Sequence, residues 1–143
     1  MKKKKFYKVI GVMTGTSMDG IDISFCNTDG LNKIKILHEK SYQYSLSDQL
    51  IIKNILIKDK NNIKLIKKFD LIITNIIITF LKKFFKKFDI KNQNVDFISL
   101  SGQTILHLPI KKYTLQLGNH KLISEYFKLN SVSNFRIKDI LNG

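Results

Sequence analysis

The chain has 143 residues, 43% of them hydrophobic, with a formal net charge of +14 and one cysteine. These values fit one globular domain with a buried core, and the single cysteine excludes an intramolecular disulfide and fits a reducing compartment. Nucleic-acid binding is not expected, because nearly all of the positive charge is lysine spread along the chain, whereas base readers use arginine and interleaved aromatic side chains.

No secretion or membrane segment is expected either. The lysines at positions 2–5 precede a segment that Lys8 interrupts, and no small-residue cleavage site follows it. The longest apolar run, residues 71–81, contains Asn and Thr and is shorter than the roughly 20 residues that span a bilayer. We therefore predict a cytoplasmic protein that does not bind a membrane.

The first third of the chain is predicted to form three strands. Residues 6–12, 21–26 and 33–45 are the expected strands, and Asp29-Gly30 marks the turn before the third. In the second strand, Ile21 and Ile23 alternate with Asp22, which is strand period. The isoleucines can therefore enter a core while Asp22 faces a site, and Cys26 is expected to be a small core residue.

Helices then alternate with further strands. Ser47-Asp48 can cap a helix that ends near residue 57, and residues 64–88 carry apolar side chains at three- and four-residue steps, with lysines opposite. Further strands are expected at 95–101, 113–118 and 131–135, and a helix at 119–128. The pattern predicts an α/β layer fold in which the long helix covers the sheet. We favour that interpretation over a basic helix on an anionic membrane.

The segment GVMTGTSMDGIDISFC, residues 11–26, concentrates glycine, hydroxyl and acidic residues between two strands. Such a loop can direct several backbone N–H groups at one anion, and Asp19 or Asp22 could hold Mg²⁺. A P-loop is excluded, because Ile21-Asp22 stands where Lys-Ser/Thr is required. A plain hairpin turn on Asp19-Gly20 has a similar composition, so the residues alone leave both interpretations open.

The whole segment closely resembles the G-T-S-x-D-G-x-D signature of anhydro-N-acetylmuramic acid kinases. Three later segments resemble motifs of the same family in the same order: SGQTILHLP (101–109), YTLQLGNHKLISE (113–125) and VSNFRIKD (132–139). The resemblance implies the N-terminal lobe of an actin-like ATPase/sugar-kinase fold, a β-meander sheet with covering helices, with residues 1–143 as that single lobe. The second lobe, the adenosine pocket and the Asp that activates water are expected beyond Gly143.

The resemblance also implies an activity and its site. The family uses ATP and Mg²⁺ to open the ring of 1,6-anhydro-N-acetylmuramic acid and phosphorylate its 6-oxygen, in the recycling of cell-wall sugars. Carried over by position, the ATP-phosphate loop comprises Gly15, Thr16, Ser17, Met18, Asp19, Gly20, Ile21 and Asp22, with Asp19 and Asp22 as candidate Mg²⁺ ligands. The residues expected near the sugar are Gln103, Thr104, Arg136 and Asp139. A fork-shaped Arg136 suits the lactyl carboxylate of such a sugar.

Several polar positions depart from the family pattern. Ser101 stands where the family has His, Asn119 and Asn134 stand where it has Asp, and Leu106 replaces a polar residue. These changes make sugar binding less certain to be retained than phosphate binding, because the motif of the phosphate loop is intact.

The expected protein is a truncated kinase that retains its ATP loop and catalyses little. The alternatives are one chain of a split kinase with a partner supplying the other lobe, and a non-catalytic basic module for nucleic acid or membranes. A lone lobe is also expected to expose apolar surface and to form homo-oligomers.

Overall fold

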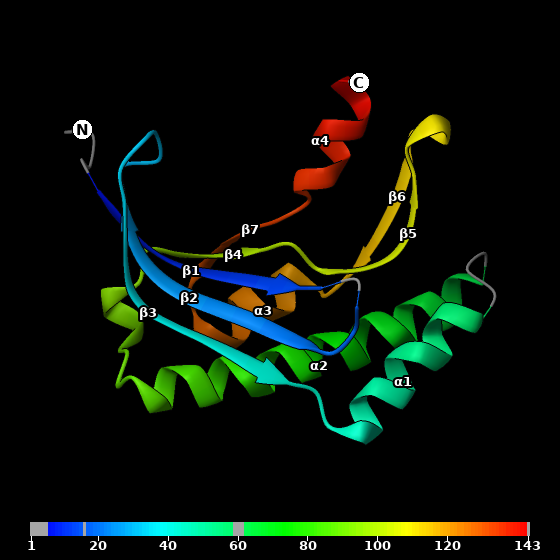
Figure 1. Ribbon diagram of the computed structural model, residues 1–143, viewed down its shortest axis with the longest axis horizontal. Helices are drawn as coiled ribbons and strands as arrows, with labels where there is room; N and C mark the ends of the chain where they lie inside the picture. Colours follow the sequence, from blue (N-terminus) through cyan, green and yellow to red (C-terminus); the bar gives the residue numbers. More distant parts are fainter. Residues whose placement is uncertain (1–5, 16, 59–61, 143) are drawn as a thin grey trace.

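A five-stranded sheet of order β3-β2-β1-β4-β7 forms the centre of the molecule (Figure 1). The computed structural model describes residues 6–15, 17–58 and 62–142. Strands β1 (Tyr7–Thr14), β2 (Gly20–Thr28) and β3 (Ile34–Gln43) form the predicted antiparallel meander. Strands β4 (Phe97–Leu100) and β7 (Asn130–Val132) extend the sheet in parallel with β1.

The alternation in β2 gives the sheet one apolar and one polar face. Ile21 and Ile23 are each 1% exposed, and Asp22 lies on the opposite, open face. A register shift follows at Phe25/Cys26, where Cys26 is buried as expected. At the far end of β2, Asp29 Oδ1 accepts hydrogen bonds from three consecutive backbone N–H groups, those of residues 31–33. The predicted turn is thereby fixed by an aspartate side chain.

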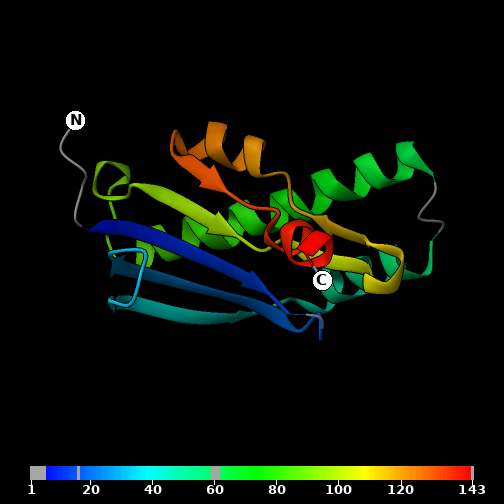
Figure 2. The ribbon, with the colours of Figure 1, turned by 90° about the horizontal axis from the view of Figure 1, so that it is seen from above.

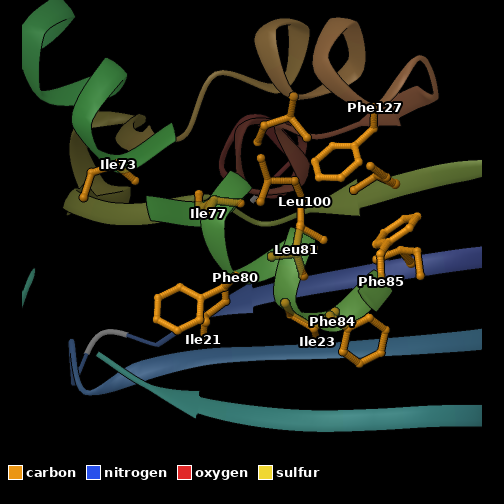
Figure 3. Close-up of a cluster of buried hydrophobic side chains, with 14 of the residues drawn as sticks. Ile21, Ile23, Ile73, Ile77, Phe80, Leu81, Phe84, Phe85, Leu100 and Phe127 are labelled. Carbon is orange, nitrogen blue, oxygen red and sulfur yellow. The ribbon is translucent and has the colours of Figure 1, made fainter. Parts of the chain in front are cut away.

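Three helices cover the apolar face of the sheet: α1 (Leu46–Ile57), α2 (Ile63–Lys87) and α3 (His120–Phe127). Figure 3 shows side chains of α2 between Ile21 and Ile23 of β2 on one side and Phe127 of α3 on the other. Phe85 of α2 stacks on Phe127 at a centroid distance of 5.2 Å. The long predicted helix and its role as the cover of the sheet are confirmed.

The buried stripe of α2 is rotated from the predicted one, because the helix packs against α3 as well as the sheet. Of the apolar positions at the predicted steps, Phe80 and Phe84 are buried, and the others are half-buried, namely Leu65, Phe69, Ile72, Ile76 and Phe88. The buried residues are Ile73, Thr74, Ile77, Phe80, Leu81, Phe84 and Phe85. The lysines predicted to face solvent, at positions 68, 82 and 86, are exposed. None of the helices that the structure describes is both long and apolar enough to cross a bilayer.

Two elements of the second half differ from the predictions. Residues 103–108 form an unpredicted strand, β5 (Gln103–Leu108), which pairs only with β6 (Tyr113–Leu117) as a separate hairpin (Figure 2). The strand predicted at 131–135 ends at Val132, and Phe135 begins helix α4 (Phe135–Asn142). Asn134 has a φ of 65°, a left-handed conformation that Asn tolerates, and it redirects the chain. Helix α4 rises on the side of the sheet opposite to α2 (Figure 1).

The caps of two helices show how local side chains set their ends. Helix α1 is capped by Ser45, whose Oγ accepts from the N–H of Asp48 at 3.1 Å, rather than by the predicted Ser47-Asp48 pair. Helix α3 is capped by Asn119, whose Oδ1 accepts from the N–H groups of Lys121 and Leu122 at 3.1 and 3.2 Å. The boundaries predicted for both helices are confirmed within one residue or two.

We expect the Asn119→Ala variant to unfold at a temperature about 3 °C lower than the wild type, because a lost N-cap costs about 1 kcal/mol. The Asn119→Asp variant is the matched control, since an aspartate caps a helix equally well. Thermal unfolding followed by circular dichroism measures both. Equal melting temperatures for Asn119→Ala and Asn119→Asp would contradict a capping role.

Candidate phosphate-binding site

The glycine-rich segment forms the exposed loop between β1 and β2, residues 15–19. Ser17 Oγ donates to Asp19 Oδ1 at 2.6 Å, and this hydrogen bond is the main reason why the pKa of Asp19 is lowered below its ordinary value. Both side chains are exposed, and Met18 has a φ of 57°. Of the two threonines in this segment, Thr14 is buried at the end of β1 and Thr16 lies outside the described residues. The loop therefore presents a hydroxyl and an ionised carboxylate to solvent.

Two hydrogen bonds hold the ends of this loop from inside the molecule. Gln103 Nε2 donates to the carbonyl oxygen of Gly15 at 3.0 Å. The backbone N–H of Tyr44, just past β3, donates to the carbonyl oxygen of Asp19 at 2.8 Å. Both terminal carbonyl groups are therefore occupied by protein donors. Carbonyl oxygens carry partial negative charge and would repel an anion, so this arrangement favours anion binding on the outer side of the loop.

Gly20 is required by the close approach of β3. A Cβ atom at this position would lie closer than 3.0 Å to the carbonyl oxygen of Tyr42, a backbone atom in the neighbouring strand. At Gly15 the nearest atom to an added Cβ is Ser17 Oγ at 3.0 Å, the end of a small side chain. The glycine at the end of the loop thus lets β2 and β3 pair, and the one at its start leaves room for the Ser17 hydroxyl.

The remaining loop positions divide between the core and the open face of the sheet. Ile21 is buried in the core and lies between Thr14 of β1 and Tyr42 of β3, so its side chain is not available to a ligand. Asp22 lines a hollow of about 810 Å³ on the open face, together with Ser24, Ser41 and Ser99. Phe135, at the start of α4, also lines this hollow. The two candidate Mg²⁺ ligands therefore differ in setting: Asp19 is bonded to Ser17 in the loop, and Asp22 faces the hollow.

Arg136 and Asp139 come together at a second hollow, of about 550 Å³, between α4 and the β5–β6 hairpin. His107 and Lys112 of the hairpin also line it. Among the described residues that line it, Arg136 and Lys112 carry positive charge and Asp139 carries negative charge, so the wall is net positive and suits a ligand with a carboxylate. Thr104 is half-buried and pairs with Gln116 in the hairpin. Gln103 is fully buried beside the phosphate loop and does not line this hollow.

Comparison with known proteins identifies the family of the chain. A sequence model of the family described as anhydro-N-acetylmuramic acid kinase matches residues 7–143. The chain belongs to the anhydro-N-acetylmuramic acid kinase family. The anhydro-N-acetylmuramic acid kinase of Pelagibacter ubique is 38% identical in an alignment that covers 98% of this chain and 38% of that relative.

Two further relatives named anhydro-N-acetylmuramic acid kinase give the same result. The Sulfurimonas denitrificans protein is 33% identical over 97% of this chain and 37% of its own length. The Zymomonas mobilis protein is 31% identical over 94% of this chain and 39% of its own length. The chain thus spans less than two fifths of the curated relatives that it matches, and it corresponds to their N-terminal part.

The structure gives local roles to three residues that depart from the family pattern. Asn119 caps α3, a role that an aspartate would also fill. Asn134 forms the turn into α4. Ser101 donates its backbone N–H to the Val12 carbonyl at 3.2 Å and lines the hollow on the open face of the sheet. Asn119, which replaces the Asp of the family pattern, therefore caps a helix and lines neither of the two hollows.

Three features of this site were not predicted from the sequence. His107 and Lys112 are not among the predicted site residues, because the hairpin that brings them beside Arg136 was not predicted. The link between Gln103 and Gly15 joins positions 88 residues apart, for which a single sequence carries no signal. The family resemblance marked Gln103, but it implied a place near the sugar.

The described residues contain no group of three or more His, Cys, Asp or Glu side chains that could hold a metal. Mg²⁺ commonly uses one or two carboxylates together with substrate phosphates and water. The exposed, ionised Asp19 and the exposed Asp22 are residues of the right chemistry for that arrangement.

Proposed function

We propose that this chain provides the ATP-phosphate-binding part of an anhydro-N-acetylmuramic acid kinase. The observation that carries this proposal is the loop of residues 15–19, whose terminal carbonyl groups are both held inward while Ser17 and Asp19 face outward. An ordinary hairpin turn needs neither an exposed serine–aspartate pair nor a buried glutamine behind it. The family membership of the chain supports ATP as the phosphoryl donor.

The proposed reaction joins a hydrolysis to a phosphoryl transfer. Water opens the 1,6-anhydro ring of anhydro-N-acetylmuramic acid, and the freed 6-oxygen takes the γ-phosphoryl group of ATP, leaving ADP. This phosphotransferase reaction would serve the recycling of cell-wall sugars in the cytoplasm. In this scheme Ser17 and the backbone N–H groups of the loop bind phosphate oxygens. Asp19 or Asp22 would hold Mg²⁺, and the ion would neutralise phosphate charge.

The sugar is proposed to lie toward Arg136 and Asp139. Arg136 can donate two parallel hydrogen bonds to the lactyl carboxylate. Lys112, on the same hollow, adds positive charge, and Asp139 can accept from a sugar hydroxyl. Thr104 lies on the same hairpin and is proposed to act near the sugar as well.

Phosphoryl transfer is proposed to need sequence that corresponds to the remaining length of the relatives. Transfer depends on groups that position the donor and the acceptor from several sides at once. This chain matches 38% of the length of the Pelagibacter ubique relative. The remaining groups that position ATP and the sugar would then come from residues outside this sequence, as in a kinase split between two chains. Exposed apolar side chains on α1, namely Leu46, Leu50 and Ile57, are proposed contacts for a partner or a second copy.

The experiment that tests this proposal combines a titration with a complementation assay. Mg-ATP is titrated into the purified chain by calorimetry. Phosphoryl transfer from γ-labelled ATP to 1,6-anhydro-N-acetylmuramic acid is then measured for the chain alone and with the C-terminal part of the Pelagibacter ubique relative added. We expect binding of Mg-ATP by the chain, and transfer only in the mixture. Absence of Mg-ATP binding would refute the phosphate loop, and full turnover by the chain alone would refute the need for the added part.

A further inference from the structure

The first residue of β5 is a completely buried glutamine that reaches from the hairpin to the phosphate loop. Gln103 is 0% exposed, and its Nε2 donates to the Gly15 carbonyl oxygen at 3.0 Å. Strand β5 pairs only with β6, so this side chain is a direct link between the separate hairpin and the loop of the central sheet. Gln103 therefore faces the loop from behind, on the side away from solvent.

The hydrogen bond from Gln103 fixes the direction of the Gly15 carbonyl, which affects how well the loop can bind an anion. A carbonyl oxygen turned toward phosphate would repel it, and a carbonyl drawn inward removes that repulsion. At the other end of the loop the Asp19 carbonyl is held by a backbone N–H, that of Tyr44. The Gly15 carbonyl also accepts from the Met18 N–H within the loop, at a longer 3.4 Å, and Gln103 is the side chain that draws it inward at 3.0 Å.

We propose that Gln103 is a positioning residue: it holds the Gly15 carbonyl inward, so that the loop keeps the conformation that binds phosphate, and it does not contact the sugar. This inference rests on the proposed function for its link to ATP. It assigns Gln103 a place behind the phosphate loop, where the family resemblance implied a place beside the sugar.

The amide oxygen of Gln103 makes it possible to distinguish this positioning role from a purely structural one. Gln103 Oε1 is buried and has no hydrogen-bond partner among the described residues, which costs stability. Replacing Gln103 with methionine, a side chain of similar length, removes the bond to Gly15 and also removes the unpaired oxygen. The two effects oppose each other, so the Gln103→Met variant should keep its stability while its loop loses the inner hydrogen bond.

A buried threonine elsewhere in the chain provides the matched control. Thr74 is 0% exposed, and its Oγ1 donates to the Asp70 carbonyl and accepts from the Asn119 N–H at 2.6 and 2.7 Å. The Thr74→Val variant loses one hydrogen bond within α2 and one from the N-cap residue of α3 to α2, both away from the loop. We expect its melting temperature to fall by about 3 °C or more, and that of Gln103→Met to stay within about 2 °C of the wild type.

Hydrogen exchange without ligand tests the positioning directly. In Gln103→Met, amide exchange in the peptide covering residues 14–20 should rise about fivefold, the change that loss of one hydrogen bond produces, and in Thr74→Val it should not change. Unaltered exchange of this peptide in Gln103→Met would overturn the inference, whatever the protein binds.

Titrations with Mg-ATP and with 1,6-anhydro-N-acetylmuramic acid test whether the conformation of the loop affects ligand binding. With Mg-ATP, the dissociation constant of Gln103→Met should rise about fivefold and that of Thr74→Val should stay at the wild-type value. If the wild type itself does not bind Mg-ATP, the proposed function fails, and the role toward phosphate fails with it. Weaker binding of 1,6-anhydro-N-acetylmuramic acid by Gln103→Met, with unchanged loop exchange, would overturn the inference in favour of a contact with the sugar.

Discussion

The Gly20→Ala variant is expected to lose about 3 kcal/mol of its free energy of unfolding and most of its affinity for Mg-ATP. The added Cβ would lie closer than 3.0 Å to the Tyr42 carbonyl oxygen, and a backbone atom in a paired strand cannot rotate away. Overpacking of this kind costs about 1–3 kcal/mol. Separating the strands here also strains the hydrogen bond from the Tyr44 N–H to the Asp19 carbonyl, which adds about 1 kcal/mol.

Urea unfolding and Mg-ATP titration measure the two losses, and Gly15→Ala is the matched control. Its Cβ would meet Ser17 Oγ at 3.0 Å, and a serine side chain can turn away, so Gly15→Ala should cost less than about 1 kcal/mol. If Gly20→Ala and Gly15→Ala have equal stability, the close approach of β3 at Gly20 is not what requires a glycine at that position.

The first half of the fold follows from patterns within a few residues of each other. Alternation in β2 and the Asp29-Gly30 turn predict the meander, because strand period and turn chemistry are local properties. The long helix was predictable for the same reason, since its apolar spacing extends over 25 residues. The face that α2 buries was less predictable, because the position of its stripe depends on α3, which lies some 40 residues further along the chain.

The second half depended on contacts that the sequence does not display. Residues 103–108 form a strand only in partnership with β6, and Asn134 turns the chain into α4 where a continuing strand was expected. The residues of the candidate site also divide into those set by local sequence and those set by long-range contacts. The loop at 15–22 could be recognised as a compact motif, whereas the hollow that joins Arg136 to Lys112 arises from the packing of α4 against the hairpin.

The carboxylate of Asp19 provides the sharpest test of the phosphate loop as a Mg-ATP site. We expect Asp19→Asn to weaken Mg-ATP binding about 10- to 100-fold, and to reduce phosphoryl transfer in the complemented assay at least as much, because a ligand or partner of Mg²⁺ loses its charge. An amide oxygen can still accept the Ser17 hydroxyl, so the loop should keep its shape and the melting temperature should change little.

Asp29→Asn controls for the change in net charge. Asp29 lies in the turn at the other end of β2, and hydrogen bonds from backbone N–H groups lower its pKa as the Ser17 hydroxyl lowers that of Asp19. Both carboxylates are therefore ionised from pH 5 to pH 8, and both variants add one positive charge. Asp29→Asn should bind Mg-ATP like the wild type, and the difference between the two variants should persist across that pH range.

Titration of ATP with and without Mg²⁺ separates a metal-binding carboxylate from one that only shapes the loop. A carboxylate repels free ATP, so in the presence of a chelator Asp19→Asn should bind ATP as well as the wild type or better. With Mg²⁺ present the order should reverse, because the wild-type carboxylate then faces a cation. If Asp19→Asn weakens ATP binding equally with and without Mg²⁺, Asp19 acts through the conformation of the loop, and the metal-binding role passes to Asp22 on the open face of the sheet.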